Sequence, residues 1–229
     1  PRSDIIQGTF NPEIFTASLS NVLHAYNAPQ AIRTVYTVPE IFFQQATYPT
    51  QGLTTVLNAA LGRLAGINTY PAIQRLETAF GGGKTHTLIA LIHLAQKGKD
   101  LASLVQGYVT EDILPEPSTV HVIGIAGDEL PLYRTRGSDL VPYTLWGEIA
   151  YRIGGEELYR ELQAEAESYA SPGSSFFEKI FAGRKVLIMF DELAQYATRL
   201  QAARSDGSDQ LAAFLMGLHG YARNHSHIS

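Results

Sequence analysis

Apolar residues recur at helical spacing through the first part of the chain and predict three helices. The first begins at the capping residue Asn11 and ends near Tyr26, the second covers Pro39–Ala46, and the third has apolar positions from Leu53 to Leu64 and ends at Gly66. Each is bounded by residues that favour caps or chain breaks, such as Asn, Pro and Gly. We therefore expect residues 1–68 to form a helical N-terminal segment that packs on the rest of the chain.

Shorter apolar runs follow and predict buried parallel strands. Val186–Phe190 is unbroken, and Thr119–Ala126 is nearly so, with His121 expected in the core. A third strand is expected over Ala72–Thr78, although polar residues interrupt it. Strands that alternate with helices are typical of an α/β fold, and we expect a three-layer α-β-α sandwich with a parallel sheet over residues 69–229.

Several further segments belong to this expected core. A long insertion, predicted to be mostly helical, occupies about 129–180 between the two strongest strands. Leu101–Val105 predicts a short helix and Gln210–Arg223 a last, longer one. The final residues are typical of the approach to another strand, so we expect the core to continue beyond Ser229.

A glycine-rich segment joins the expected strand at Ala72 to an apolar helix. Consecutive glycines allow several backbone N–H groups to point into one concavity. The following helix adds its unpaired first-turn N–H groups and the positive end of its dipole, and both favour a polyphosphate. The expected phosphate-binding residues are Thr78, Ala79, Phe80, Gly81, Gly82, Gly83, Lys84 and Thr85.

The chemistry of this segment depends on Lys84 and Thr85. In the pattern G-x-x-x-x-G-K-[ST], the Lys reaches the β- and γ-phosphates and the hydroxyl binds Mg²⁺. The chain matches the last part of the pattern, but Thr78 stands at the first glycine position. A glycine-rich turn followed by a chance Lys-Thr pair is the alternative interpretation.

Two carboxylates, Asp191 and Glu192, follow directly after the apolar run Val186–Phe190. In P-loop NTPases the Asp at the end of such a strand organises Mg²⁺, and a following Glu polarises the attacking water. Many strands end in acidic residues, so this feature alone is weak. Together with the glycine-rich segment it predicts a P-loop NTPase, with Lys84 and Glu192 as catalytic residues and Thr85 and Asp191 as metal ligands.

Three residues near the loop each allow two interpretations. Tyr48 lies beside the nucleotide base or packs a turn, and His86 contacts the ligand or packs against its neighbours. Glu77 orients Thr85 or a water near the γ-phosphate, or it is a surface carboxylate at the end of a strand.

Composition restricts the classes of function. The chain has 229 residues, 45% of them apolar, which is enough for a substantial core. It has no cysteine, which excludes disulfides, thiolate metal sites and a cysteine nucleophile. Its apolar runs are far shorter than the ~20 residues that span a bilayer. The net charge of −5, without a basic patch, argues against strong nucleic-acid binding by this region alone. We expect a cytoplasmic protein without membrane contact.

The segment Leu76–Leu91 resembles the signature of a family of large prokaryotic AAA-type P-loop ATPases of unassigned function. Members are typically encoded near DNA methyltransferases in restriction-like or phage-defence clusters. Three other segments are similar to the same family: Thr47-Tyr48-Pro49-Thr50, Arg63-Leu64-Ala65-Gly66 and Phe190-Asp191-Glu192. The resemblance implies an AAA/ASCE-like fold, ATP and Mg²⁺ as cofactors, and a full-length protein several times longer than this chain.

The same resemblance sets expectations about partners. They are a homo-oligomer, a ring by analogy with AAA assemblies, or methyltransferase and defence subunits. Nucleic acid would be contacted only indirectly, through other domains.

Two functions from different classes remain open. The first is an ATP hydrolase that drives conformational change in a DNA-processing or defence assembly. The second is a nucleotide-binding switch or scaffold with negligible turnover. Glu192 discriminates between them, because a switch does not need it and a hydrolase does. A small-molecule kinase is a distant third, because the sequence shows no acceptor site or Arg-rich lid.

Overall fold

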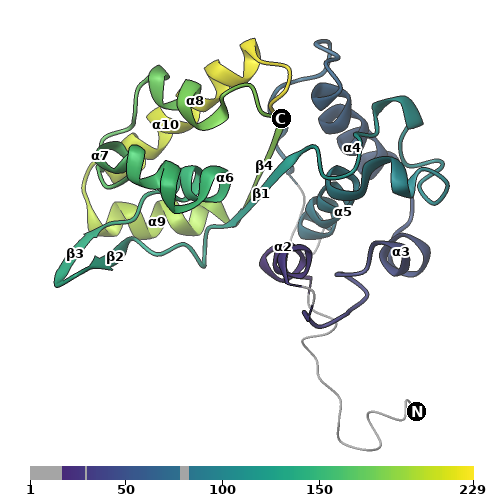
Figure 1. Ribbon diagram of the computed structural model, residues 1–229, viewed down its shortest axis with the longest axis horizontal. Coiled ribbons are helices and arrows are strands. Elements are labelled where there is room, and N and C mark those ends of the chain that lie inside the picture. The colour runs from purple at the N-terminus through teal and green to yellow at the C-terminus, as the bar shows by residue number, and fades with distance from the viewer. Residues whose placement is uncertain (1–16, 29, 78–82) are drawn as a thin grey trace, which may run out of the picture.

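The computed structural model of the protein describes residues 17–28, 30–77 and 83–229. Helices cover both faces of a small parallel sheet, so the chain is a mixed α/β protein (Figure 1). The sheet lies at the centre of the molecule, and the two groups of helices lie on either side of it. Each group encloses its own apolar core against one face of the sheet.

The sheet consists of β1 (His121–Ala126) and β4 (Val186–Asp191), which pair in parallel. The register joins the first residues of the two strands, and it also joins their last residues, Ala126 and Asp191. Both strands therefore end at the same edge of the sheet. This arrangement places Asp191 and the residue after it beside the loop that follows β1.

The end of the chain also pairs with β4. Ile228 forms a parallel bridge with Val186, and the backbone N–H of Ile188 donates to the carbonyl of Ser229 at 2.9 Å. The final residues thus lie along β4, on the segment where the sequence predicts the approach to a further strand.

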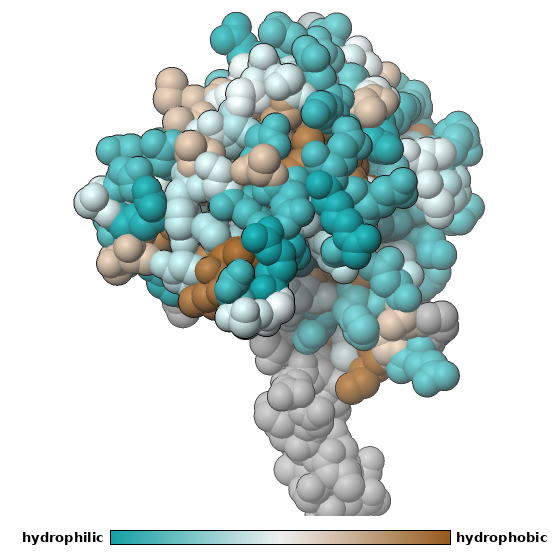
Figure 2. Space-filling view, turned by 60° about the vertical axis from the view of Figure 1, so that its left-hand side comes forward, coloured by the Kyte–Doolittle hydropathy of each residue, from teal (hydrophilic) through white to brown (hydrophobic). Residues whose placement is uncertain are grey.

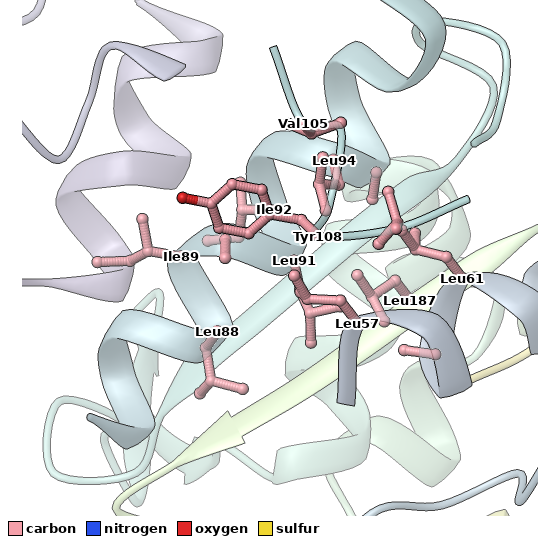
Figure 3. Close-up of a cluster of buried hydrophobic side chains, with 14 of the residues drawn as sticks. Leu57, Leu61, Leu88, Ile89, Leu91, Ile92, Leu94, Val105, Tyr108 and Leu187 are labelled. Atoms are coloured by element: carbon pink, nitrogen blue, oxygen red, sulfur yellow. The ribbon is translucent and has the colours of Figure 1, made fainter. Parts of the chain in front are cut away.

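The first helical layer contains the N-terminal helices and the helix after the glycine-rich segment. A tyrosine from outside these helices, Tyr108, also packs in this core. Figure 3 shows leucines and isoleucines of the helices over 51–64 and 84–97 converging on Leu187 of β4. The elements are α2 (Leu19–Asn27), α3 (Pro39–Ile41) with the π-helix Phe42–Ala46, α4 (Gln51–Leu64), α5 (Lys84–Lys97), and the 3₁₀ helices Gly98–Leu101 and Glu111–Ile113.

The second helical layer is rich in buried aromatic rings. The ring of Phe214 lies 5.3 Å from that of Trp146 and 5.6 Å from that of Phe177, measured between centroids. Gly155 interrupts one of the two longest helices of this layer, because its backbone leaves the helical region. The elements are α6 (Leu145–Glu161), α7 (Gln163–Ala166), α8 (Ser174–Phe181), α9 (Leu193–Ala203) and α10 (Gly207–Asn224).

A hairpin extends from this second layer (Figure 1). It is formed by β2 (Tyr133–Arg136) and β3 (Asp139–Pro142), which pair in an antiparallel manner. Arg134 and Arg136 both pair with Glu167, with nitrogen to oxygen distances of 2.9 and 2.5 Å. The predicted insertion between β1 and β4 therefore contains a hairpin as well as helices.

The side chains of the sheet alternate between the two cores, as strand geometry requires. Leu187 and Met189 pack in the first layer's core, whereas Val186, Ile123 and Ile125 pack in the second. A strand buried on both faces needs apolar residues at every position. The unbroken apolar run of β4 is explained by this burial.

Arg63 connects the two layers. Its side chain lies on α4 and is only 3% exposed, and its guanidinium donates to the carbonyls of Ala222 at 2.6 Å and Arg223 at 3.0 Å. These carbonyls lie at the C-terminal end of α10, where a helix carries unpaired acceptors and partial negative charge. The cation therefore caps a helix of the opposite layer.

Three sequence predictions are wrong in detail. The region 71–77 forms no strand, and no described strand pairs with it. The short helix expected at Leu101–Val105 is replaced by the 3₁₀ helix Gly98–Leu101 and turns. His121 is exposed at the start of β1, not buried.

The N-terminal helix also differs from its predicted bounds. It begins at Leu19, and the side chain of Ser18 caps it by accepting from the N–H of Asn21. The predicted cap Asn11 lies outside the described residues.

The surface of the second layer is mostly hydrophilic, with small scattered hydrophobic areas (Figure 2). Leu140 on the hairpin and Met216 on α10 are among the exposed apolar side chains. Across 17–28, 30–77 and 83–229, no helix combines the length and apolarity needed to cross a membrane.

Candidate functional site

The centre of the candidate site is a hydrogen bond between two residues far apart in the sequence. The hydroxyl of Thr85 donates to Oδ2 of Asp191 over 2.7 Å. Thr85 lies in the first turn of α5, and Asp191 is the last residue of β4. The structure thus brings together the two residues predicted to bind a metal ion.

Local sequence explains why α5 begins at this place. Gly83 has a φ of 78°, in the left-handed region that favours glycine, and the helix starts at the next residue, Lys84. Leu88 and Leu91 of α5 then pack in the core that contains Leu187 of β4. This packing holds the first turn of α5 against the carboxyl end of β4.

The carboxylate of Asp191 is held at both oxygens. Oδ2 accepts from Thr85, and Oδ1 accepts from the backbone N–H of Glu192 at 3.1 Å. Glu192 itself is exposed and has a φ of 49°, a left-handed conformation that is uncommon for a residue with a Cβ. Its Oε2 accepts from the amide of Gln195 at 3.0 Å.

The donor set at this site fits Mg²⁺. The ion prefers oxygen ligands, and it usually takes one or two carboxylates together with phosphate oxygens and waters. Thr85 and Asp191 supply a hydroxyl and a carboxylate at one point. Elsewhere in the described ranges, no cluster of three or more His, Cys, Asp or Glu forms an alternative metal site.

A cavity of about 760 Å³ adjoins these residues. Lys84, Asp191 and Glu192 contribute to its lining, together with the polar side chains Gln74 and Arg75. The remaining walls are mostly apolar and come largely from α4, α5, β4, α9 and α10. The 72–76 segment and β4 both contribute to its walls.

His86 connects α5 to the segment that precedes α4. Its ring lies 4.6 Å from that of Phe42 and 6.2 Å from that of Tyr36, between centroids, and its Nε2 lies 2.9 Å from Oγ1 of Thr47. Burial lowers the pKa of this imidazole. These contacts favour the packing interpretation of His86. The neighbouring Tyr48 is 78% exposed and is not among the residues that line the cavity.

A second histidine of α5 is buried in a polar network. Nε2 of His93 lies 2.9 Å from the carbonyl of Tyr36, and Nδ1 lies 2.6 Å from the hydroxyl of Tyr26. A carbonyl only accepts, so Nε2 carries the proton and Nδ1 accepts from Tyr26. Burial lowers the pKa of His93 to about 4, against a smaller opposing effect of the Tyr36 carbonyl. The ring is therefore neutral near pH 7.

The structure describes only the last part of the predicted phosphate-binding segment. Thr78, Ala79, Phe80, Gly81 and Gly82 lie outside the described residues. The end of the segment is described, and there Gly83, Lys84 and Thr85 form the start of α5.

Glu77 does not reach Thr85. Its carboxylate pairs with Arg75 at 2.7 Å, and both side chains are largely exposed. This geometry favours the surface-carboxylate interpretation.

Sequence reasoning did not identify the residues that surround Glu192. Arg199 on α9 donates to the carbonyls of Gly127 and Leu130, at 2.5 and 2.8 Å, and Gln195 donates to Glu192 itself. The only local signal was the glycine directly after β1, and Arg199 had no sequence signal that separates it from a surface residue.

Fold and site together define an α/β protein in which a parallel strand delivers adjacent Asp and Glu residues to the first turn of a helix. The chain belongs to the family of the DUF499 N-terminal domain, whose profile matches residues 2–124 and 130–226. Comparisons with curated proteins and with solved structures found no significant match. The family's description states no activity, so the function has to be argued from the site.

Proposed function

We propose that this chain is the ATP-binding and ATP-hydrolysing module of a larger AAA-type P-loop ATPase. The observation that carries the proposal is the 2.7 Å hydrogen bond between Thr85 and Asp191. The sequence predicts that Thr85 supplies the hydroxyl of a phosphate-binding segment and that Asp191 supplies the carboxylate of a metal-binding strand. Their contact across 106 positions is what a shared nucleotide site requires, and a chance Lys-Thr pair has no reason to make it.

The first turn of α5 provides the contacts to the phosphates. The N–H groups of a helix's first turn have no acceptor within the helix, and together with the positive end of the dipole they favour an anion bound at the N-terminus. Lys84 is the first residue of this helix and also lines the adjoining cavity, so its ammonium can reach the β- and γ-phosphates. Exposed Tyr48 is the proposed neighbour of the adenine base.

The carboxyl end of β4 provides the hydrolytic groups. Asp191 and Thr85 would hold Mg²⁺, which neutralises negative charge on the phosphate oxygens when it is bound. Glu192 is exposed and follows Asp191 directly, so its carboxylate can accept a proton from the water that attacks the γ-phosphate. Binding and hydrolysis would therefore depend on different residues.

The biological setting follows from the family resemblance described above. We place the module in the cytoplasm, in a DNA modification, restriction or phage-defence system. Its partners would be further copies of the same protein or methyltransferase and defence subunits. DNA would be contacted through other domains, in keeping with the net charge of −5.

The test compares Lys84→Ala and Glu192→Gln with the wild type in ATP binding and ATP turnover. Lys84→Ala should weaken binding about tenfold or more, because a charge-assisted contact to phosphate is lost. Glu192→Gln should keep binding and lower turnover by about 10² to 10⁴, the usual contribution of a general base.

Two outcomes would contradict this proposal in different ways. If Lys84→Ala binds ATP as tightly as the wild type, the P-loop assignment is wrong. If the wild type binds ATP and neither it nor Glu192→Gln turns it over at any protein concentration, the chain is a nucleotide-binding switch or scaffold.

A further inference from the structure

The backbone of Glu192 is held in an uncommon conformation by a neighbouring loop. This loop, Gly127–Leu130, follows β1 and lies beside Glu192 because β1 and β4 end at the same edge of the sheet. The N–H of Gly127 donates to the carbonyl of Asp191 at 2.8 Å, which extends the hydrogen-bonded pairing of β1 and β4 by one residue. The contact places the loop directly against the left-handed turn at Glu192.

The approach of the loop leaves no space for a side chain at Gly127. A Cβ at this position would lie 2.5 Å from the carbonyl oxygen of Glu192 and 2.9 Å from Cα of Leu193. Both of these are backbone atoms, so the clash could be relieved only by moving the turn or the loop.

Arg199 fixes the loop in this position. Its NH2 group donates to the carbonyls of Gly127 at 2.5 Å and Leu130 at 2.8 Å, which are the two ends of the loop. Arg199 lies on α9, the helix that Glu192 itself caps. The same helix carries Gln195, whose amide donates to Oε2 of Glu192 at 3.0 Å. Backbone and side chain of Glu192 are thus both held from α9.

We infer that Arg199 is a positioning residue that sets the place of the Glu192 carboxylate through the Gly127–Leu130 loop. This inference rests on the proposed ATP hydrolysis, because it assigns a role to residues that touch neither phosphate nor metal. In this inference the loop positions Glu192, the group that activates the water, whereas nucleotide binding depends on α5. Disturbing the loop should therefore lower kcat and leave the affinity for ATP unchanged.

The experiment uses two unrelated ways to disturb the loop. Gly127→Ala introduces the clash with Glu192, and Arg199→Met removes both donors and keeps a side chain of similar length. The matched controls are Gly220→Ala, where an added Cβ meets nothing within 4 Å, and Arg160→Met, whose side chain is 73% exposed. Arg199→Lys is the conservative variant, since an ammonium can still donate to the two carbonyls.

Three quantities are measured on each purified variant: the Kd for ATP, kcat, and the amide hydrogen exchange of peptides covering 127–130 and 192–195. We expect Gly127→Ala and Arg199→Met to lower kcat about 10- to 100-fold, as a displacement of about 1 Å does. Their Kd values should equal that of the wild type, and Arg199→Met should exchange faster at both peptides. Arg199→Lys should recover part of kcat.

Wild-type kcat in both loop variants would overturn the inference and leave the proposed hydrolysis intact. A rise in Kd that matches the fall in kcat would also overturn it, because the effect would then be a general loss of structure. If the wild type shows no turnover, the proposed hydrolysis fails first. In that case, wild-type exchange at 192–195 in Arg199→Met overturns the inference, and faster exchange supports the positioning of Glu192.

Discussion

The two helical layers contact the candidate site through different residues. The layer formed by α2 to α5 supplies Thr85, whose hydroxyl binds Asp191. The layer formed by α6 to α10 supplies Gln195, which donates to Glu192, and Arg199, which donates to the loop beside it. The side chains of Asp191 and of the residue after it, Glu192, are thus contacted from opposite faces of the sheet. We therefore expect damage to the α2–α5 layer to impair nucleotide binding and damage to the α6–α10 layer to impair turnover.

The largest expected effects come from truncating one large buried ring in each layer. Phe42 and Phe214 are both fully buried, at 0% exposed. Phe42→Ala and Phe214→Ala should each lower the free energy of unfolding by about 3 to 5 kcal/mol. Only Phe42→Ala should also weaken ATP binding by the folded protein, because Phe42 packs against His86 in the first turn of α5.

Chemical denaturation and ATP titration on the same samples check this pair. Each variant serves as the matched control of the other, because the substitution and the burial are the same. Equal weakening of ATP binding by Phe214→Ala would show that the two layers are not separable in this way.

The next effect concerns the buried His93 of the first layer. Its pKa is lowered to about 4, whereas an unfolded histidine titrates near 6.5. Between these values the unfolded state binds the proton and the folded state does not, so stability falls as the pH decreases from 7 to 4. The loss from this residue should be about 3 kcal/mol at pH 4 and should level off below it.

Unfolding free energies of the wild type and His93→Gln, measured from pH 7 to pH 4, check this prediction. The variant should be less stable at pH 7 but should lose about 3 kcal/mol less on acidification. The control is His219→Gln, since His219 is exposed on α10. Identical pH dependence in the wild type and His93→Gln would contradict the buried, neutral state of His93.

The smallest predicted effect isolates the hydroxyl of Thr85. Thr85→Ala removes the donor to Asp191 and the proposed Mg²⁺ ligand, and Thr85→Ser keeps both. Loss of a contact to a charged group should weaken Mg²⁺-dependent ATP binding by about 1.5 to 3 kcal/mol, roughly 10- to 100-fold. ATP titrations with Mg²⁺ and with EDTA measure it. Thr85→Ala and Thr85→Ser with the same affinity would argue against a metal-binding role.

The elements next to the site could be predicted because their signals are local. Gly83 before an apolar helix and the apolar run before Asp191 each specify one element in a few consecutive residues. The structure then brings the ends of these elements together. The assignment to P-loop NTPases remains a prediction, because five residues of the glycine-rich segment, 78–82, lie outside the described ranges.

The remaining features depend on contacts between distant parts of the chain. Arg199 and Gly127 are 72 positions apart, and no spacing rule relates them. The strand expected over 72–78 was inferred from its apolar positions, yet Ile73 is 47% exposed and no described strand pairs with it. A strand needs a neighbour as well as a pattern. The β2–β3 hairpin had a local signal at Gly137, which has a φ of 63°, but its strands are too short for clear alternation.

The capping of α10 by Arg63 has a consequence for how the protein unfolds. If the end of α10 frayed alone, the buried guanidinium on α4 would lose the carbonyls of Ala222 and Arg223 while the rest of its layer stayed folded. Only the weaker contact to Oδ1 of Asn68, at 3.3 Å, would remain among its described hydrogen bonds, and a buried cation that loses charge-complementary acceptors is unfavourable. The C-terminal turn of α10 is therefore coupled to α4, although α4 precedes it by more than a hundred residues and belongs to the other layer. This coupling links the unfolding of the two helical layers across the sheet.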